Sequence, residues 1–478
     1  MLKDIYNRSN QLTNLLVLVT LFIIIGVSLT TNITKPRLWV DEGKTIELAR
    51  NYLNYKTLDI QVAPGEFSNI APVLQSTGYP VSIPLALFFK IFGLGPHQAR
   101  IFMLIWLTAT LYATFFIATK IFGHKEALFS FLLIASFASF YDNGRTVVGE
   151  IPGFLMLLTG LYFWLKKEDH LTCGLVWGLS VVTKPSVFLI IIPTIVLTIL
   201  EKNIESVKKL SQIALGMMPA AALWFMVVIK DSLPTAITAI TTFYRNPYSS
   251  DISTNIIRNI KALPFSITII YFSGLFITIL ISRYLTSAKD NISRLYNFII
   301  IYTIFAFIYY LRSPGWLRYI VIAELLILFV LPDAIWKIIE KIQNIKSENK
   351  QAAWVMILVT LITIQTIQIF TLAHIYYSDN VPKIISYINS EHPDSSVGTI
   401  GVIEAGAFFN TNKRYTMLDL TGMPRIGADM LEGDNRPEIV VVNSSTLTDS
   451  SINKIIDEKY RLVTSIERYN IYKLKGLK

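Results

Sequence analysis

The sequence is built from long apolar blocks, most of them about 16 to 25 residues in length, with short polar segments between them. A helix of about 20 apolar residues crosses the hydrocarbon core of a bilayer, so these blocks predict membrane-spanning helices. Of the 478 residues, 53% are hydrophobic and 16% are charged, whereas about a quarter are charged in a soluble chain. This composition excludes a disordered chain, and the single Cys excludes a disulfide-rich one. We therefore expect a polytopic α-helical membrane protein.

The first block, Leu12–Thr30, follows Lys3 and Arg8, which predicts an uncleaved anchor with a cytoplasmic N-terminus. Val81–Phe92 is apolar but too short to cross, which predicts an interfacial or re-entrant helix. About eleven transmembrane helices are expected. Their predicted bounds are Leu12–Thr30, Ile101–Ile121, Glu126–Tyr141, Glu150–Leu165, Leu171–Thr183, Ser186–Leu200, Leu210–Ile229, Pro264–Ser282, Leu295–Leu311, Leu317–Trp336 and Ala352–His374.

Basic residues test this topology, because cytoplasmic loops of membrane proteins are enriched in Lys and Arg. With the N-terminus inside, every cytoplasmic segment is basic, whereas counting Val81–Phe92 as a further span would break the agreement. Much of the net charge of +10 is therefore expected to orient the chain in the plasma (inner) membrane, and no nucleic-acid partner is expected. The basic groups are Lys3/Arg8, Lys120/Lys125, Lys166/Lys167, Lys202/Lys208/Lys209, Arg283/Lys289/Arg294 and Lys337/Lys341/Lys346/Lys350.

Two units are expected along the chain. Residues 1–375 form the transmembrane domain, whose first outer loop, 32–100, carries surface helices, and residues 376–478 form a small extracytoplasmic α/β domain. In the second unit the pattern predicts strands at Val397–Ile403, Tyr415–Asp419 and Ile439–Val442, a helix at Asp449–Tyr460, and a hairpin within Arg461–Leu474. Cys173 lies in a span and is expected to be a small buried hydrophobic residue.

The most distinctive polar motif is Trp39-Val40-Asp41-Glu42-Gly43-Lys44, just after the first span. The residues that follow it have apolar side chains at helical spacing, which predicts a surface helix with both acids in its first turn. The helix dipole keeps carboxylates ionised at that position. Two interpretations are open: an ordinary N-cap in which Asp41 caps the helix, or an acid pair that takes part in catalysis.

A second acid, Glu150, opens the next span at its outer end, after a polar segment that contains Asp142 and Arg145. An acid at that depth costs free energy unless it is paired or functional. The alternative interpretation is a second N-cap, with Pro152 at an early helical position.

Several cations lie on the same predicted side as these acids. Lys184 occupies a tight turn between two spans, Arg318 lies at the outer end of the predicted span Leu317–Trp336, and Arg100 directly precedes Ile101–Ile121. Taken singly, each fits a side chain that snorkels to the membrane surface. Together with Asp41 and Glu150 they suit a reaction on a lipid phosphate, because cations hold the phosphate while an acid takes a proton from the nucleophile.

Other chemistry has less support in the sequence. We find no nucleotide-binding glycine loop, and the five His residues show no metal-ligand spacing, so no metal site is predicted and dependence on a divalent metal is left open. Trp316 and Tyr319 fit either an interfacial aromatic belt or the lining of a sugar pocket.

In their order and placement these motifs resemble the membrane glycosyltransferases of family 39. That family has the type C fold and includes protein O-mannosyltransferases and the enzyme that adds aminoarabinose to lipid A. The resemblance covers nearly the whole chain. It rests on Asp41-Glu42 with Ile46-Glu47-Leu48-Ala49-Arg50, on Tyr79-Pro80, Phe92-Gly93-Leu94-Gly95 and Ala99-Arg100, on Glu150-Ile151-Pro152, Thr183-Lys184-Pro185 and Leu317-Arg318-Tyr319, and on Gly401–Gly406 with Asp419-Leu420-Thr421-Gly422.

The resemblance implies an inverting transfer of one sugar from a polyprenyl-phosphate donor to an acceptor hydroxyl on the outer face. It implies Asp41 as the general base, with Glu42 and Glu150 as further catalytic residues: Glu42 orients the acceptor or neighbouring donors, and Glu150 lies near the sugar or acceptor. The leaving phosphate would be bound by Lys184, Arg318 and Arg100. Candidate contacts to the sugar or acceptor are Asp142, Arg145, Trp316 and Tyr319.

The expected partners are the bilayer, the lipid-linked sugar as donor, and a glycan, lipid or protein as acceptor, with no further cofactor assigned. Alternative functions are a multispan transporter, a flippase, or a ligase of lipid-linked glycans. A transporter would usually place its charges near the midplane on broken helices with repeated halves, whereas here the charges lie at span ends and no repeat is found.

Overall fold

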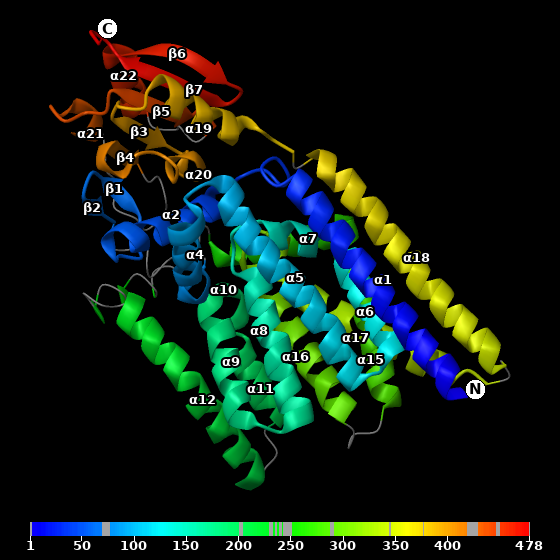
Figure 1. The fold of residues 1–478 in the computed structure, drawn as a ribbon. Helices are drawn as coiled ribbons and strands as arrows, with labels where there is room; N and C mark the ends of the chain where they lie inside the picture. Colours follow the sequence, from blue (N-terminus) through cyan, green and yellow to red (C-terminus); the bar gives the residue numbers. More distant parts are fainter. Residues whose placement is uncertain are drawn as a thin grey trace.

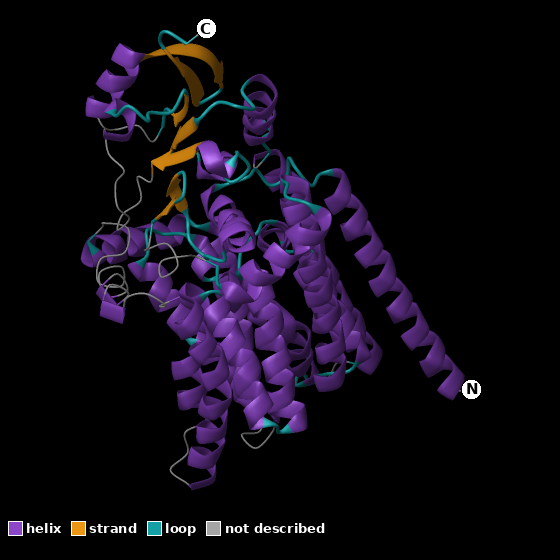
Figure 2. Cartoon of the chain, turned by 60° about the vertical axis from the view of Figure 1, so that its left-hand side comes forward, coloured by secondary structure: helices purple, strands orange, loops and turns teal. Residues whose placement is uncertain are grey.

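The computed structural model describes residues 2–68, 77–199, 204–228, 233–234, 237–238, 241, 251–286, 291–343, 346–375, 377–417, 429–445 and 450–477. A bundle of long helices makes up most of the molecule, and a small mixed sheet lies at one end of it (Figures 1 and 2). The N-terminus lies at the opposite end of the bundle from this sheet. The expected class, a helical membrane protein with a small C-terminal α/β unit, is confirmed.

Each expected span coincides with a helix or a pair of consecutive helices. Six of the described helices are long and apolar enough to cross a membrane, or up to seven if the bent pair α7 and α8 is one span, so the count of about eleven stays a prediction. The helices are α1 (Leu2–Thr30), α5 (Pro96–Ile121), α6 (His124–Ala135), α8 (Glu150–Tyr162) continued by the π-helix η1 (Phe163–Lys167), α9 (His170–Thr183), α10 (Pro185–Phe188), α11 (Ile191–Ile199), α12 (Ile204–Val228), α15 (Ile267–Leu285), α16 (Asn291–Arg312), α17 (Val321–Glu340) and α18 (Ser347–Ile375).

The segment before Glu150 differs from the expectation. The predicted span Glu126–Tyr141 is broken: α6 ends at Ala135, and a new helix, α7 (Ala138–Arg145), continues into the expected loop. The Ser136 hydroxyl lies 2.9 Å from Gln365 Oε1 of α18 and 3.2 Å from Leu133 O, so its hydrogen bonding is satisfied at this break. α7 meets α8 at a bend of 111°, which places the start of α8 at the end of the bundle that carries the sheet (Figure 1).

The first outer loop folds into α2 (Val40–Tyr55), a short ribbon of β1 (Gln61–Ala63) and β2 (Glu66–Phe67), and α4 (Tyr79–Phe92). α4 is a short separate helix, as its length predicts. It packs against α2 and α5 through a buried apolar cluster that includes Ile46, Ala49, Leu85 and Ala99. α2 therefore lies between the bundle and the sheet (Figure 1). The remaining elements before the sheet are α14 (Ile252–Ala262) and the 3-10 turns η3 (Leu263–Phe265) and η4 (Leu317–Tyr319).

The C-terminal unit is a five-stranded sheet with the order β4-β3-β5-β7-β6. β3 pairs in parallel with β4 and β5, and β7 runs antiparallel to β5 and β6. The central strand β5 is buried throughout, and the predicted helix and hairpin are present. The elements are α19 (Asn380–Glu391), β3 (Val397–Ile400), α20 (Ile403–Gly406), η5 (Thr411–Lys413), β4 (Arg414–Met417), α21 (Asp429–Glu432), β5 (Ile439–Asn443), α22 (Ser450–Lys459), β6 (Tyr460–Ile466) and β7 (Tyr469–Leu474). The segment Asp419–Gly422 lies outside the described residues.

Candidate active site

The candidate site begins with the first turn of α2. The N-cap residue of this helix is Trp39, whose backbone is extended and whose side chain makes no capping bond. Asp41 and Glu42 both lie inside the first turn, so the interpretation of Asp41 as the N-cap is wrong. Because consecutive helical residues are about 100° apart around the axis, the two carboxylates point in different directions and meet different partners.

Asp41 is paired with Arg318. Arg318 Nη1 donates a hydrogen bond to Asp41 Oδ2 at 2.5 Å. The side chain of Arg318 is 19% exposed and that of Asp41 is 13% exposed. Arg318 lies in η4, a 3-10 turn that precedes α17, rather than in the expected span Leu317–Trp336. Its guanidinium carbon is 5.2 Å from the ring centre of Trp39 and 4.5 Å from that of Trp316. These rings hold the guanidinium beside Asp41, at an opening that leaves both groups partly accessible.

The charge around Asp41 is strongly positive. Burial would raise the pKa of Asp41, but Arg318, Lys44 and Lys184 outweigh it and lower this pKa to about 2. Lys44 lies one helical turn after Asp41 and on the same face of α2. Burial lowers the pKa of Lys44, Asp41 raises it, and the neighbouring Arg318 and Lys184 lower it further. Asp41 is thus an ionised carboxylate among three cations.

Lys184 joins the site through a tight connection between α9 and α10. Because Pro185 follows it, Lys184 is kept out of the helical conformation (φ −150°, ψ 80°) and α9 ends at Thr183. Lys184 Nζ lies 3.0 Å from Glu150 Oε1, and both side chains are almost completely buried. In the described part of the chain, neither Lys184 Nζ nor the Glu150 carboxylate has another hydrogen-bond partner. This pair therefore has unused hydrogen-bonding capacity beside Asp41.

Glu42 and Arg100 form a closed pair. Arg100 donates from Nε and Nη2 to the two carboxylate oxygens of Glu42, both at 2.9 Å, and from Nη1 to Asn32 O at 2.7 Å. Neither side chain of the ion pair is exposed. Arg100 belongs to α5, so this bidentate pair fixes the start of α2 to the helical bundle. In this conformation neither group is open to a ligand.

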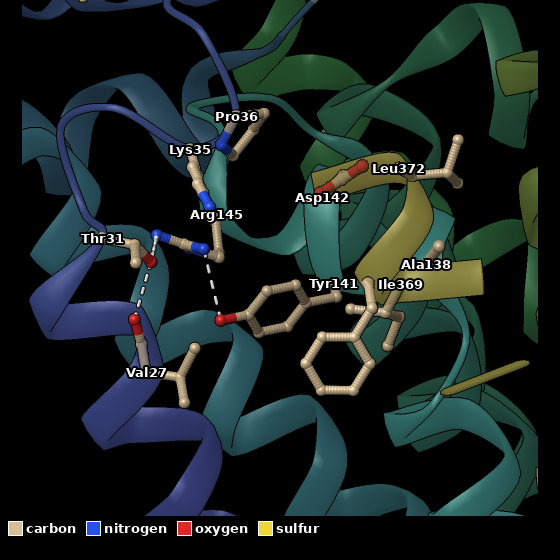
Figure 3. Close-up of a pocket in the computed structure, with 11 residues that line it drawn as sticks. Val27, Thr31, Lys35, Pro36, Ala138, Tyr141, Asp142, Arg145, Ile369 and Leu372 are labelled. Atoms are coloured by element: carbon tan, nitrogen blue, oxygen red, sulfur yellow. Dashed lines mark hydrogen bonds between the residues drawn. The ribbon is translucent and has the colours of Figure 1, made fainter. Parts of the chain in front are cut away.

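Asp142 and Arg145 lie at a separate cavity of about 160 Å³, which Figure 3 shows. Arg145 donates to the Thr31 hydroxyl at 2.8 Å and to the Tyr141 hydroxyl at 3.2 Å, which ties α7 to α1. Asp142 lines the same cavity, together with Lys35 and with apolar side chains of α1 and α18. The cavity lining includes none of Asp41, Lys184 and Arg318.

The structure thus separates the predicted site residues into three groups. Asp41 and Arg318, with Lys184 and Glu150, share one positively charged centre, and Trp316 and Tyr319 flank it. Glu42 and Arg100 are paired with each other beside it, and Asp142 and Arg145 line the cavity. In the described ranges no group of three or more His, Cys, Asp and Glu side chains is arranged to hold a metal ion.

Sequence reasoning missed two members of the charged centre, Lys44 and Trp39. Both are in the motif that the sequence singles out, but neither was assigned to the site. Asp41 and Lys44 are three residues apart, which places both side chains on one face of a helix. This spacing could have assigned Lys44 to the site from the sequence alone. The contact of Trp39 with Arg318 joins residues far apart in the chain, so no local pattern could predict it.

Comparisons with known proteins agree with this architecture. Residues 81–244 match the family model described as dolichyl-phosphate-mannose-protein mannosyltransferase. No curated protein matches the chain. The structure is similar to that of ArnT from Cupriavidus metallidurans bound to undecaprenyl phosphate, with a TM-score of 0.66 and 13% identity, covering 96% of this chain and 97% of that one.

Two larger proteins share the fold. The oligosaccharyltransferase AglB from Archaeoglobus fulgidus, in complex with an inhibitory peptide and a dolichol-phosphate, matches with a TM-score of 0.54 and 10% identity over 96% of this chain and 74% of that one. The arabinofuranosyltransferase AftD from Mycobacteria matches with a TM-score of 0.52 and 11% identity, over 96% of this chain and 40% of that one. The resemblance to membrane glycosyltransferases of the type C fold is therefore confirmed.

Proposed function

We propose that this chain, which has the type C fold of membrane glycosyltransferases, transfers one sugar from a polyprenyl-phosphate donor to an acceptor hydroxyl at the outer membrane surface. The observation that carries the proposal is the charged centre, in which an ionised carboxylate lies among three cations. Lys44, Lys184 and Arg318 outnumber Asp41 and Glu150 by one charge, and a phosphate would use that excess. The ArnT structure with undecaprenyl phosphate supports a lipid phosphate as the donor group for this fold.

Asp41 is the proposed general base. It takes the proton of the acceptor hydroxyl while the hydroxyl oxygen attacks the anomeric carbon, and the bond from that carbon to the phosphate oxygen breaks. The phosphate leaves with the bonding electrons, so no general acid is needed. Base and leaving group lie on opposite faces of the sugar, and the configuration at the anomeric carbon is therefore inverted, by the geometric logic of inverting glycosidases.

Arg318 and Lys184 are the proposed ligands of the leaving phosphate, where fixed cations stabilise developing negative charge. Arg318 is now bound to Asp41, so donor binding would exchange this carboxylate for phosphate. That exchange frees Asp41 for the acceptor and raises its pKa, because its pairing with Arg318 weakens. Free Asp41 is a better base than the paired carboxylate seen here.

Glu150 and Glu42 support this chemistry from their ion pairs. Glu150 is paired with Lys184 and would hold it at the proposed phosphate position, and a contact of Glu150 with the sugar is part of the proposal. Glu42, fixed by Arg100, holds the first turn of α2 in place. Arg100 was expected among the phosphate ligands. All three of its guanidinium nitrogens already donate hydrogen bonds, to Glu42 and Asn32, so Arg100 is a positioning residue in this proposal.

The test uses purified full-length protein reconstituted in lipid vesicles and polyprenyl-phosphate sugars that carry a radioactive sugar, with extracted envelope glycans and lipids as acceptors. We expect release of free polyprenyl phosphate and labelled acceptor from the wild type, and neither from Asp41→Asn. Asp394→Asn is the matched control, because Asp394 is an exposed acid of the C-terminal unit. Near-normal turnover by Asp41→Asn would overturn the assignment of the base. Label that crosses the membrane without bond cleavage would support a flippase or transporter instead.

A further inference from the structure

The helix that carries Asp41 is held from two sides. From the helical bundle, Arg100 of α5 binds Glu42 in the first turn. From the C-terminal unit, Arg414 binds Glu47, whose carboxylate oxygens lie 2.8 and 2.9 Å from Arg414 Nη2. Glu42 and Glu47 are separated by about 140° around the helix axis, so the two arginines hold different faces of α2.

The contact with Arg414 is completely buried. Neither Glu47 nor Arg414 has an exposed side chain, and Glu47 Oε1 also accepts a hydrogen bond from Gln61 N at 2.9 Å. One turn further, Arg50 donates to Ala407 O at 2.8 Å and to Phe409 O at 3.2 Å. Arg50 Nη2 also lies 3.5 Å from Glu47 Oε1, so Glu47 is paired with both arginines. A buried, hydrogen-bonded ion pair such as Glu47 with Arg414 has a defined geometry, because separating its members leaves buried charge less well compensated.

The C-terminal unit also packs against the first turn of α2, which carries Asp41, through close backbone contact with α20. A Cβ atom on Gly43 would lie 2.5 Å from Glu404 Cα, so only glycine allows α20 to approach α2 so closely. Ile403 packs in one apolar cluster with Leu48 of α2. The segment around α20 thus packs against the part of α2 that runs from Gly43, two residues after Asp41, to the turn that contains Glu47 (Figure 1).

We propose that the C-terminal unit sets the position of Asp41 through α2, with Arg414 as a positioning residue. The proposal rests on the function proposed above. Glu47 lies six residues after Asp41, which is about 9 Å along a rigid helix at 1.5 Å per residue. A shift of α2 at the Arg414 contact is therefore carried directly to the carboxylate that must meet the acceptor hydroxyl.

The matched variants replace neighbouring cations at the start of β4. Arg414→Gln removes the buried ion pair, whereas Lys413→Gln removes an exposed one, since Lys413 pairs with the exposed Asp394. Because displacement of a reacting group by about 1 Å costs up to about 100-fold in rate, we expect Arg414→Gln to lower kcat by roughly 10- to 100-fold. The KM for the polyprenyl-phosphate sugar should stay close to that of the wild type, because the cations that bind phosphate are unchanged.

Two further variants separate positioning from general damage. Arg414→Lys keeps a cation opposite Glu47 and should recover much of kcat. Glu47→Gln keeps the shape of the side chain and removes its charge, so it should lower kcat as Arg414→Gln does, and it carries the test if Arg414→Gln does not fold. Lys413→Gln should remain within about twofold of the wild type, as expected for a surface substitution. A folded Arg414→Gln or Glu47→Gln with wild-type kcat would overturn the inference.

A second measurement does not need transferase activity. In the described structure Cys173 is fully buried, so a cysteine introduced as Asp41→Cys is the accessible thiol of the catalytic turn. We expect a small maleimide to label this position several-fold faster when Arg414→Gln is added, and at an unchanged rate when Lys413→Gln is added. Because Asp41→Cys lacks the proposed base, sugar transfer is measured on the protein with Asp41 intact. If that protein transfers no sugar while the labelling is faster, the proposed function is rejected and the positioning role is kept. Equal labelling rates would reject the positioning role.

Discussion

At the residue scale, the charged centre depends on a carboxylate that stays ionised while it is largely buried. Burial would raise the pKa of Asp41, and Arg318 together with the two lysines lowers it to about 2. Asp41 is therefore ionised at every pH at which a membrane enzyme is normally assayed. In the donor-free enzyme, whose ionisations kcat/KM reports, loss of this proton therefore does not limit kcat/KM above about pH 4.

The substitution Arg318→Gln should change this pH dependence. It removes the nearest cation, so burial has a larger effect and the pKa of Asp41 rises. A base must be ionised to act. The acidic limb of the pH profile of the residual kcat/KM should therefore lie at higher pH in Arg318→Gln than in the wild type. Arg258→Gln, at an exposed arginine of α14, is the control. An unchanged acidic limb in Arg318→Gln would contradict the coupling of Arg318 to Asp41.

The pair of Glu150 and Lys184 leads to a prediction on stability. Because both side chains are buried, Lys184→Met leaves the Glu150 charge without its partner and should cost about 3–5 kcal/mol in the free energy of unfolding. Glu150→Gln should have a cost of the same order. The double variant should cost clearly less than the sum of the two, because neither charge remains. Denaturant unfolding of all four proteins measures this coupling, and additive effects would show that the pair does not interact.

At the element scale, α2 is the segment on which the bundle and the sheet converge, and Gly43 sets how closely they approach. A methyl group at this position meets backbone atoms of Glu404 at 2.5 and 2.8 Å, which cannot move aside as a flexible side chain would. Gly43→Ala should therefore destabilise the protein by about 1–3 kcal/mol and lower its activity. Thermal unfolding and the transferase assay measure the two effects.

The control for Gly43→Ala is another helical glycine. Gly26 in α1 has no atom within 4 Å of the position that a Cβ would occupy. Gly26→Ala should change the stability by no more than about 1 kcal/mol, in the stabilising direction, since Ala has the higher helix propensity. Equal effects of the two substitutions would show that the close approach at Gly43 does not matter.

At the scale of the whole molecule, the topology predicted from basic loops places the charged centre and the sheet outside the cell. Cysteine labelling in right-side-out membrane vesicles tests this orientation. A membrane-impermeant maleimide should label Lys413→Cys in intact vesicles, and Glu348→Cys only after the membrane is opened. Cys173 is buried and contributes little background. Labelling of Glu348→Cys in intact vesicles would place that loop outside and overturn the orientation.

Much of this architecture could be predicted from sequence, because each element follows from a local pattern. Apolar blocks predicted the helices, and the alternation in Arg461–Leu474 predicted the hairpin of β6 and β7. The break at Ser136 was not predicted, since isolated serines among apolar residues, here Ser136 and Ser139, are a weak signal. Helix ends were also shifted, as at Arg318, which precedes α17 instead of lying within it.

The candidate site was predicted only in part. Charge placement in the sequence indicated that Asp41, Lys184 and Arg318 share a membrane surface, but not which groups pair. Asp41 and Arg318 are separated by 277 residues, and the choice of Arg318 for Asp41 and of Arg100 for Glu42 depends on how the helices pack. Pairing of this kind is a property of the folded chain, and no local spacing contains it.

The ion pair of Glu47 and Arg414 also has a consequence for biosynthesis, because its members are 367 residues apart in the chain. At a synthesis rate of about 5–20 residues per second, Glu47 leaves the ribosome roughly 20–70 seconds before Arg414. The strands β5, β6 and β7, which complete the sheet on the far side of β3 from β4, are made later still. The helix that carries Asp41 is therefore held only from the bundle, through Arg100, until the last part of the chain is complete. A product of translation that is truncated before Arg414 would contain every residue of the charged centre but would lack the second contact that holds α2.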